Sequence, residues 1–426
     1  MNVHDLKGKT VAAALSGGLD SCTITRWLTD NGVRVVAFTA DVGQPDEPDL
    51  RKVQERLLAS GAVEAHIVDG KQLMANAGCL AVQAQAIYEG EYWNTTGIGR
   101  HVIVAAMIPA MRKKGIHILV HGATGRGNDQ VRFQFITNMF EPTFQVYAPW
   151  RDEIFIKKFG GRKQMIDFCL ERKLPIKHTH QKPYSTDANL LGLTHEAGKL
   201  EYLYTPALFI EAEMGVLPTD APDKKETFEV TFEKGWPVKI NGKKVTTYGA
   251  FDRANAIGGK NGVGIARHLV ENRFVGIKSR GVYEMPGIVL LGKCYEYLLE
   301  LILDRRSRVL FNTLSSFIGQ QIYEGYWFAP AGQSAMSAVD FFSKLVTGSV
   351  RVELYKGQIF FKDAKNVKHG IYSPEVASME SVGTFNHADS EGFLRVLGIN
   401  AQAVSAHHQV DADAISKKMG SKHGHK

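Results

Sequence analysis

The sequence predicts an α/β protein in which a parallel-sheet domain is followed by an α+β domain that ends in a helix and a tail. Three observations predict this class: strand and helix patterns alternate from residue 10 to about 175, the pattern changes after residue 176, and 426 residues exceed one ordinary core. We place the domains at residues 1–176 and 177–405. The basic residues 406–426 are expected to be a disordered or extended tail.

The parallel sheet is predicted from apolar runs that are separated by helical patterns. Strands are expected at residues 10–15, 33–40, 64–69 and 115–122. Helices are expected at residues 22–31 and 49–60, and a longer helical region reaches Lys114. This order indicates βαβ units around a parallel sheet.

The second domain is predicted from a different pattern. Residues 226–245 and 349–363 alternate apolar and polar side chains around turn residues, which is typical of antiparallel hairpins. Residues 290–317 have the pattern of one long helix. This part of the chain is therefore expected to be α+β.

Composition excludes several classes of protein. The net charge of +7 includes no block of five like charges, so scattered solvated lysines are favoured over a nucleic-acid surface. The four cysteines form no paired motif, which predicts neither a zinc site nor a disulfide framework. The N-terminal residues MNVHDLKGKT lack the apolar core of a signal peptide, and no apolar run is long enough for a membrane span. A cytoplasmic protein is therefore expected.

The stretch LSGGLDS, residues 15–21, follows the first expected strand. Its glycines allow several backbone N–H groups to point at one spot, and the helix that follows adds the positive end of its dipole. We expect Ser16, Gly17, Gly18 and Ser21 to hold phosphates. Asp20 either helps to orient Mg²⁺ or caps the helix, and the two roles are compatible.

Two further polar stretches follow strands or lie between the domains. HGATGRGNDQVRF, residues 121–133, offers hydroxyl, amide, carboxylate and guanidinium groups that suit a zwitterionic amino acid, although Asn128 or Asp129 could simply cap a helix. YSTDANLLGLTHEAGKLE, residues 184–201, reads as a packed loop whose polar groups face a cleft between the domains, although Thr194 could belong to a capping box ahead of a helix. FTADVGQP, residues 38–45, leaves room beside Ala40 for an adenine, or is a plain strand exit.

These motifs, together with EYWNTTGIGR at residues 91–100 and VENRFVGIKSRGVYEMPG at residues 270–287, resemble the argininosuccinate synthase family from about residue 8 to 400. The first loop resembles the pyrophosphate loop of the N-type ATP pyrophosphatases. The resemblance implies an adenine nucleotide alpha hydrolase-like, Rossmann-like first domain and a synthetase and multimerisation domain. It implies ligation of L-citrulline and L-aspartate through a citrullyl-adenylate, with Mg-ATP cleaved to AMP and pyrophosphate, and a homotetramer.

The resemblance also implies site residues. It assigns Asp20, Asp129 and Arg132 to catalysis, with both Asp129 and Arg132 in the cleft rather than the core, and it assigns no metal ligand. The ATP-binding residues would be Ala14, Leu15, Ser16, Gly17, Gly18, Leu19, Asp20, Ser21, Cys22, Ala40, Gly122, Thr124, Asp129 and Asp187. Aspartate would contact Thr124, Asn128 and Asp129. Citrulline would contact Tyr92, Thr96, Asn128, Arg132, Ser185, Thr194, Glu196, Glu271 and Tyr283.

One position departs from the family pattern, and two other functions compete. Cys22 stands where the family's loop usually has serine, and a thiol is a weak donor, so one phosphate contact is expected to be lost or moved. A tRNA-modifying ligase or thiolase would share the first loop. A scaffold protein that binds nucleotide without turnover would share the fold.

Overall fold

The computed structural model describes residues 1–176, 183–380, 382–383, 386–408 and 411–420. Residues 1–370 form one compact unit and residues 371–426 form another. Both expected domains contribute to the first unit, because α3 (Lys71–Ala84) of the N-terminal half packs against α8 (Thr247–Lys260) and α9 (Pro286–Ile302). The expected boundaries at 176 and 405 stay predictions.

The N-terminal half contains a five-stranded parallel sheet, as predicted. Its strands are ordered β3-β2-β1-β4-β5 and all pairs are parallel. The bounds are β1 (Thr10–Ala14), β2 (Arg34–Asp41), β3 (Glu64–Asp69), β4 (Ile118–His121) and β5 (Gln145–Tyr147). The short β5 was not predicted from the sequence.

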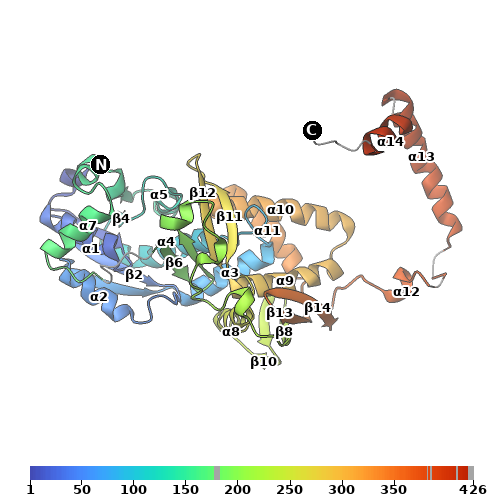
Figure 1. Ribbon diagram of the computed structural model, residues 1–426, viewed down its shortest axis with the longest axis horizontal. Coiled ribbons are helices and arrows are strands. Elements are labelled where there is room, and N and C mark those ends of the chain that lie inside the picture. Colours follow the sequence, from blue (N-terminus) through green and yellow to red (C-terminus); the bar gives the residue numbers. More distant parts are fainter. Residues whose placement is uncertain (177–182, 381, 384–385, 409–410, 421–426) are drawn as a thin grey trace. The chain divides into compact units, whose positions relative to one another are not determined.

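Helices cover both faces of this sheet, because successive strand residues point to opposite sides. Val11 and Ala13 of β1 belong to one core with α1 (Leu19–Asp30) and α2 (Leu50–Ala59). Ala12 between them belongs to a second core with α4 (Thr95–Lys113) and α5 (Asp129–Phe140). The helices α6 (Glu153–Lys158) and α7 (Arg162–Glu171) join the first of these cores. Figure 1 shows α1, α2 and α7 around the sheet in blue and green.

Two antiparallel sheets follow in the same unit. One has the order β11-β12-β7-β6, and its bounds are β6 (Ser185–Asn189), β7 (Gly192–Glu196), β11 (Arg267–Asn272) and β12 (Lys278–Glu284). The other has the order β10-β9-β8-β13-β14, with β8 (Glu226–Glu233), β9 (Trp236–Ile240), β10 (Lys243–Lys244), β13 (Gly348–Tyr355) and β14 (Gln358–Lys365). The hairpins predicted at residues 226–245 and 349–363 are confirmed and pair with each other.

The helices α9, α10 (Arg305–Glu324) and α11 (Pro330–Ser343) complete the unit's largest core together with α3 and α8. Short 3₁₀ helices lie at Val3–Leu6, Pro149–Arg151, Gly198–Glu201, Ala207–Phe209 and Pro218–Asp220. In Figure 1, α9, α10 and α11 lie toward the opposite end of the unit from the parallel sheet, with α4, β6, β11 and β12 between them.

Three sequence predictions were wrong in detail. The single helix expected over 290–317 is two helices, because the Asp304 side chain accepts hydrogen bonds from the N–H groups of Arg306 and Ser307 and starts α10. The loop expected at residues 184–201 is the hairpin of β6 and β7 followed by the 3₁₀ helix Gly198–Glu201. The tail is helical over α14 (Ala412–Gly420), and residues 421–426 lie outside the described part.

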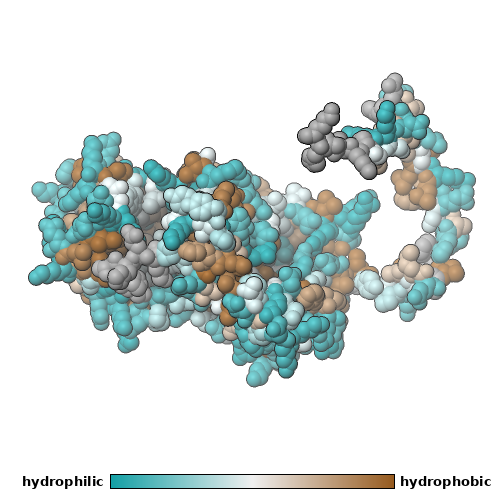
Figure 2. Space-filling view, viewed as in Figure 1, coloured by the Kyte–Doolittle hydropathy of each residue, from teal (hydrophilic) through white to brown (hydrophobic). Residues whose placement is uncertain are grey.

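The second unit contains α12 (Pro374–Ala377), α13 (Ala388–His408) and α14. Six large apolar side chains of α13 are exposed, and brown groups are visible on this unit in Figure 2. They are Phe393, Leu394, Val396, Leu397, Ile399 and Val404. Among the described residues, no helix combines the length and apolar character of a membrane span.

Candidate active site

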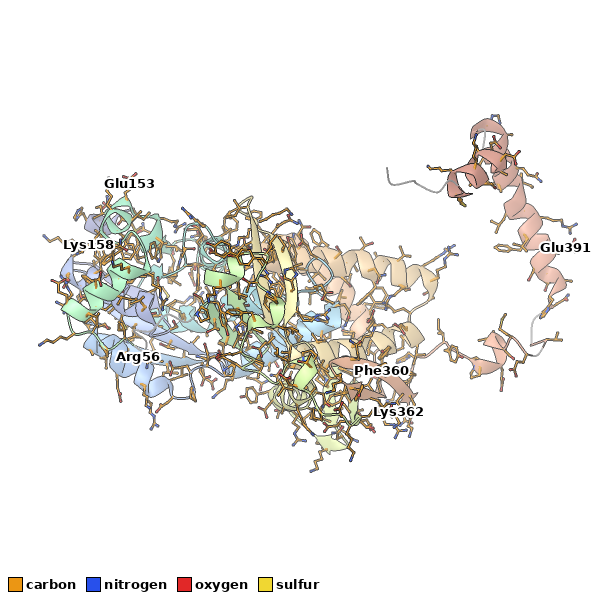
Figure 3. The ribbon with its side chains drawn as sticks, in the orientation of Figure 1. Arg56, Glu153, Lys158, Phe360, Lys362 and Glu391 are labelled. Atoms are coloured by element: carbon orange, nitrogen blue, oxygen red, sulfur yellow. The ribbon has the colours of Figure 1, made fainter. Side chains whose placement is uncertain are left out.

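The turn between β1 and α1 is held in one shape by its neighbours. Gly17 has a φ of +72°, and a Cβ placed there would lie 2.7 Å from Cγ1 of Val53. The guanidinium of Arg56, which is labelled in Figure 3, donates a hydrogen bond from Nε to the Gly17 carbonyl at 3.0 Å. Arg56 is in turn paired with Glu47 at 2.7 Å. Only glycine fits this position without strain.

The N-terminus of α1 opens from this turn. Gly18 is the N-cap residue, and no side chain described in the structure caps the helix there. The Ser16 N–H donates to the Ser21 hydroxyl at 3.1 Å, which closes the turn. Uncapped N–H groups at a helix start attract anions, so this turn is suited to phosphate.

A cavity of about 540 Å³ extends from this turn across the carboxyl ends of β1, β2 and β4. Asp20 stands at its edge, where Nε1 of Trp150 donates to Oδ1 at 3.1 Å and burial raises the pKa of the carboxyl. The antiparallel hairpin closes the cavity with residues 186–189 of β6. Glu213, which follows much later in the chain, also lines this first cavity.

A second cavity of about 890 Å³ is lined by the loop at residues 122–128 and by β7, β11 and β12. The two cavities have five lining residues in common: Asp20, Gly122, Ala123, Asp129 and Asp187. A molecule bound in the first cavity and a molecule bound in the second would therefore contact the same five residues, which we call the common wall.

An alternating row of charges crosses that wall. The Arg100 guanidinium donates to Asp129 at 2.8 Å and to Asp187 at 2.5 Å, and Arg132 donates to the other Asp129 oxygen at 2.8 Å. Burial alone would raise the pKa of Asp129, but the charges of Arg100 and Arg132 hold it well below its usual value. Asp129 is consequently ionised across the neutral range.

Arg132 is more buried than the sequence predicted. Its side chain is only 5% exposed, because Nε donates to the Tyr323 carbonyl at 2.8 Å and the guanidinium lies over the Tyr323 ring. It still lines the second cavity. The sequence predicts both Asp129 and Arg132 in the cleft rather than in the core. The Asp129 side chain, at 25% exposed, fits this expectation better than the Arg132 side chain does.

Tyrosines surround the acidic group at the far side of the second cavity. The hydroxyls of Tyr283 and Tyr323 both donate to the Glu271 carboxylate, and the Tyr92 and Tyr283 rings stack with centroids 4.3 Å apart. Burial raises the pKa of Glu271, against the effect of the Tyr323 hydrogen bond. The Thr96 and Thr194 hydroxyls lie 3.1 Å apart beside this group.

Glu196 faces the same cavity from the end of β7. Arg273 donates to it at 3.3 Å. Desolvation in the cavity and the nearby charges of Asp129, Asp187 and Glu271 raise its pKa to about 7, although Arg273 acts in the opposite direction and the side chain is 46% exposed. This carboxyl therefore changes its charge near neutral pH.

The structure brings most of the sequence-predicted residues together around the two cavities. Those lining the first are Ala14, Leu15, Ser16, Gly17, Gly18, Asp20, Ser21, Ala40, Gly122, Asp129 and Asp187. Those lining the second are Tyr92, Thr96, Thr124, Asn128, Asp129, Arg132, Ser185, Thr194, Glu196, Glu271 and Tyr283. Thr124, expected at both ATP and aspartate, lines the second cavity. Leu19 and Cys22 line neither cavity.

Cys22 faces the protein interior. Its side chain is fully buried, its Sγ lies 3.8 Å from the Gly17 carbonyl, and burial raises the pKa of the thiol. The neutral thiol packs against the Gly17 carbonyl on the interior side of the turn. The Cys22 side chain lines neither cavity, and the prediction that one phosphate contact is lost or moved here stays a prediction.

Several polar residues of the site were missed from the sequence. Arg100 lies within the quoted EYWNTTGIGR motif, but nothing in the local pattern indicates that it meets Asp129 and Asp187. Arg273 and Arg280 line the second cavity, and Glu213 lines the first. Within the described residues, no group of three or more histidine, cysteine, aspartate or glutamate side chains could hold a metal ion.

Known proteins resemble the chain over nearly its whole length. Residues 10–175 match the model of the arginosuccinate synthase N-terminal HUP domain, and residues 184–404 match that of the arginosuccinate synthase C-terminal domain. The argininosuccinate synthase of Rhodopirellula baltica is 39% identical over 92% of this chain and 96% of its own. Those of Thermotoga sp. and Desulfitobacterium hafniense are 38% and 37% identical over 91% and 92% of this chain and 95% and 96% of theirs. The chain belongs to the argininosuccinate synthase family.

Proposed function

We propose that the protein joins L-citrulline to L-aspartate at the expense of ATP, and that the first cavity holds the nucleotide while the second holds the amino acids. The observation that supports this most directly is their common wall at Asp20, Gly122, Ala123, Asp129 and Asp187. A reaction that transfers AMP to one amino acid needs the α-phosphorus at such a junction. The family activity places the protein in arginine biosynthesis.

The reaction proceeds in two displacements. The ureido oxygen of citrulline attacks the α-phosphorus of ATP, a P–O bond forms, and pyrophosphate leaves. The amine of aspartate, after losing a proton, then attacks the activated ureido carbon, and AMP leaves as argininosuccinate forms. Alignment of reactants in such a site contributes about 7 to 11 kcal/mol of barrier reduction.

The nucleotide end of the site supplies anion binding rather than acid or base chemistry. The amides of Gly17 and Gly18 would hold the β- and γ-phosphates at the N-terminus of α1 together with the hydroxyl of Ser21, whose oxygen accepts from the Ser16 amide. Mg²⁺ would enter with ATP and would be held chiefly by the phosphates, with the Asp20 carboxylate as the protein group beside it. This limited donor set fits a magnesium ion that belongs to the substrate.

The amino-acid end supplies charges of both signs. We assign Asp129 to the aspartate ammonium, with Thr124 and Asn128 beside it, and Arg132 to the citrulline carboxylate. Asn128 presents its amide N–H₂ to the cavity side, because its Oδ1 already accepts from the Phe274 N–H at 2.8 Å. Glu196 and Glu271 would hold the ammonium of citrulline, and Tyr92, Thr96, Ser185, Thr194 and Tyr283 would complete the site.

Association into a homotetramer and a cytoplasmic location are part of the same proposal. The exposed apolar side chains of α13 support self-association, because a contiguous apolar surface is typical of a contact site. The biosynthetic reaction uses ATP and free amino acids, which supports the location.

The test is phosphorus NMR of the purified protein with Mg-ATP, with and without L-citrulline and L-aspartate. The proposal expects AMP and pyrophosphate only when both amino acids are present, and no turnover by Asp129→Ala that is folded by its melting curve. ATP binding without turnover under every condition would contradict it and favour a nucleotide-binding scaffold. Turnover that depends on added tRNA would favour the tRNA-modifying alternative.

A further inference from the structure

A buried pair of titratable side chains lies directly behind the wall of the second cavity. His195 lies between Thr194 and Glu196 on β7, and Glu284 follows Tyr283 on β12. The strands are antiparallel, with Tyr283 opposite Thr194 and Glu284 opposite Leu193. Because alternate strand residues point to opposite faces, Thr194, Glu196 and Tyr283 face the cavity while His195 and Glu284 point away from it.

The two side chains are in contact and are closed off from solvent. Nε2 of His195 lies 2.6 Å from Oε1 of Glu284, and both side chains are 0% exposed. Nδ1 of His195 has no hydrogen-bond partner among the described residues. A proton on Nε2 and none on Nδ1 leaves an acceptor unpaired instead of a donor, so His195 donates from Nε2 to Glu284.

The Glu284 carboxylate also accepts hydrogen bonds from a loop that is distant in sequence. The N–H of Glu213 donates to both carboxylate oxygens of Glu284 at 3.0 Å, and the N–H of Met214 donates to Oε2 of Glu284 at 2.7 Å. The Tyr184 hydroxyl accepts from the Glu211 N–H at 2.8 Å, and the Tyr184 ring lies edge-on against His195. These contacts hold residues 211–214 on the back of the sheet.

The same loop reaches the other cavity, since Glu213 lines the first cavity. One carboxylate thus joins the strands that shape the second cavity to the loop that closes part of the first. We propose that Glu284, oriented by His195, is a positioning residue that fixes residues 211–214 against the nucleotide site. In this way it holds the walls of the two cavities in a fixed position relative to each other. The prediction of its kinetic effect rests on the proposed function.

Glu284→Gln removes the negative charge, and the amide nitrogen that replaces one carboxylate oxygen cannot accept a hydrogen bond. His195→Leu removes the histidine donor and leaves the Glu284 carboxylate with the N–H groups of Glu213 and Met214. His195→Gln restores a donor to Glu284. Glu226→Gln serves as a matched control, because Glu226 accepts from Asn261 at 2.8 Å and from Lys260 at 2.9 Å but lines neither cavity.

The full-length variants are compared by hydrogen exchange at the Glu213 and Met214 amides, by the Kd for ATP from titration calorimetry, and by the KM for ATP. We expect Glu284→Gln and His195→Leu to accelerate exchange and to weaken ATP binding by about tenfold each, the loss expected for a charge-assisted hydrogen bond. His195→Gln and Glu226→Gln should behave as wild type.

Faster exchange with an unchanged Kd for ATP would overturn the proposal, because the pair would then be merely structural, and unchanged exchange would overturn it too. If Glu284→Gln does not fold, the same measurements are compared between His195→Leu and His195→Gln. Equal exchange rates and equal Kd values for ATP in these two variants would overturn the proposal. If the wild type shows no turnover with citrulline and aspartate, the proposed function fails, while the exchange rates and the Kd for ATP still test the positioning role.

Discussion

At the scale of single residues, the Arg100 guanidinium is the group that keeps two carboxylates together at the common wall. Without it, Asp129 and Asp187 would repel each other and any phosphate brought beside them. Its side chain is 15% exposed, so water screens these charges little. Arginine suits the position because its planar fork holds two acceptors in fixed directions, which a lysine ammonium does not.

Arg100→Lys should therefore keep the fold and the charge but lose activity. We expect kcat/KM for ATP to fall by about 100-fold, the effect of displacing reacting groups by about 1 Å. The check is the rate of AMP formation at varied ATP, beside a melting curve for the folded state. Wild-type kinetics in Arg100→Lys would show that the bridge between Asp129 and Asp187 is unnecessary.

Glu196 should make citrulline binding depend on pH. Its pKa is raised to about 7, so the carboxyl is mostly neutral below that pH and mostly charged above it. Because the proposed role needs the charged form to hold an ammonium group, kcat/KM for citrulline should rise as pH increases through about 7. The measurement is kcat/KM from about pH 6 to about pH 8.

Glu196→Gln is the control for this profile, and it should be flat across the same interval. Burial lowers the pKa of His121, which precedes Gly122 at the cavities, to about 3, so that histidine stays neutral there. If kcat/KM for citrulline still rises near neutral pH in Glu196→Gln, the rise is due to the titration of a group other than Glu196.

At the scale of elements, the turn between β1 and α1 was the most predictable part of the site, because its glycines, its hydroxyls and its place after a strand are all local in sequence. The hairpin of β6 and β7 was less predictable. Its leucines and polar residues read as a packed loop, and pairing with both β6 and β12 makes β7 a strand. Arg100 could not be placed at all, since its partners lie 29 and 87 residues away.

Gly17→Ala should damage this turn specifically. The alanine would have a φ near +72° and its Cβ would lie 2.7 Å from Val53, so about 1 to 2 kcal/mol of backbone strain is joined by a steric clash. Gly8→Ala is the matched control, because Gly8 has a φ of +77° and no atom within 4 Å of its Cβ position.

Both alanine variants should lose free energy of unfolding in urea, but only Gly17→Ala should raise the Kd for ATP. Equal ATP affinities for the two variants would mean that the shape of the turn does not matter for binding.

At the scale of the whole molecule, the site is built entirely within the compact unit of residues 1–370. The second unit contributes none of the described lining residues, yet α13 exposes several large apolar side chains. Phe393 and Leu397 lie one helical turn apart, where side chains share a face. We therefore propose that the second unit serves association rather than chemistry. Lys362 and Phe360, labelled in Figure 3, belong to β14 near the end of the first unit.

The double variant Phe393→Asp with Leu397→Asp should dissociate the oligomer, because paired subunits would have to bury two carboxylates. Ser405→Asp, on the same helix, adds one exposed charge and should leave the assembly intact. Sedimentation equilibrium of the three proteins measures their masses. An unchanged mass in the double variant would place the contact surface elsewhere.

The five residues that line both cavities limit how the enzyme can be altered, in evolution or in the laboratory. Under the proposed assignment of the cavities, a substitution at Gly122, Asp129 or Asp187 alters recognition of nucleotide and amino acid together, so selection cannot improve one affinity there without testing the other. Residues that line a single cavity carry no such constraint. A change of substrate is therefore most accessible at Thr96, Thr194 and Tyr283, where a new side chain leaves the nucleotide surface as it is.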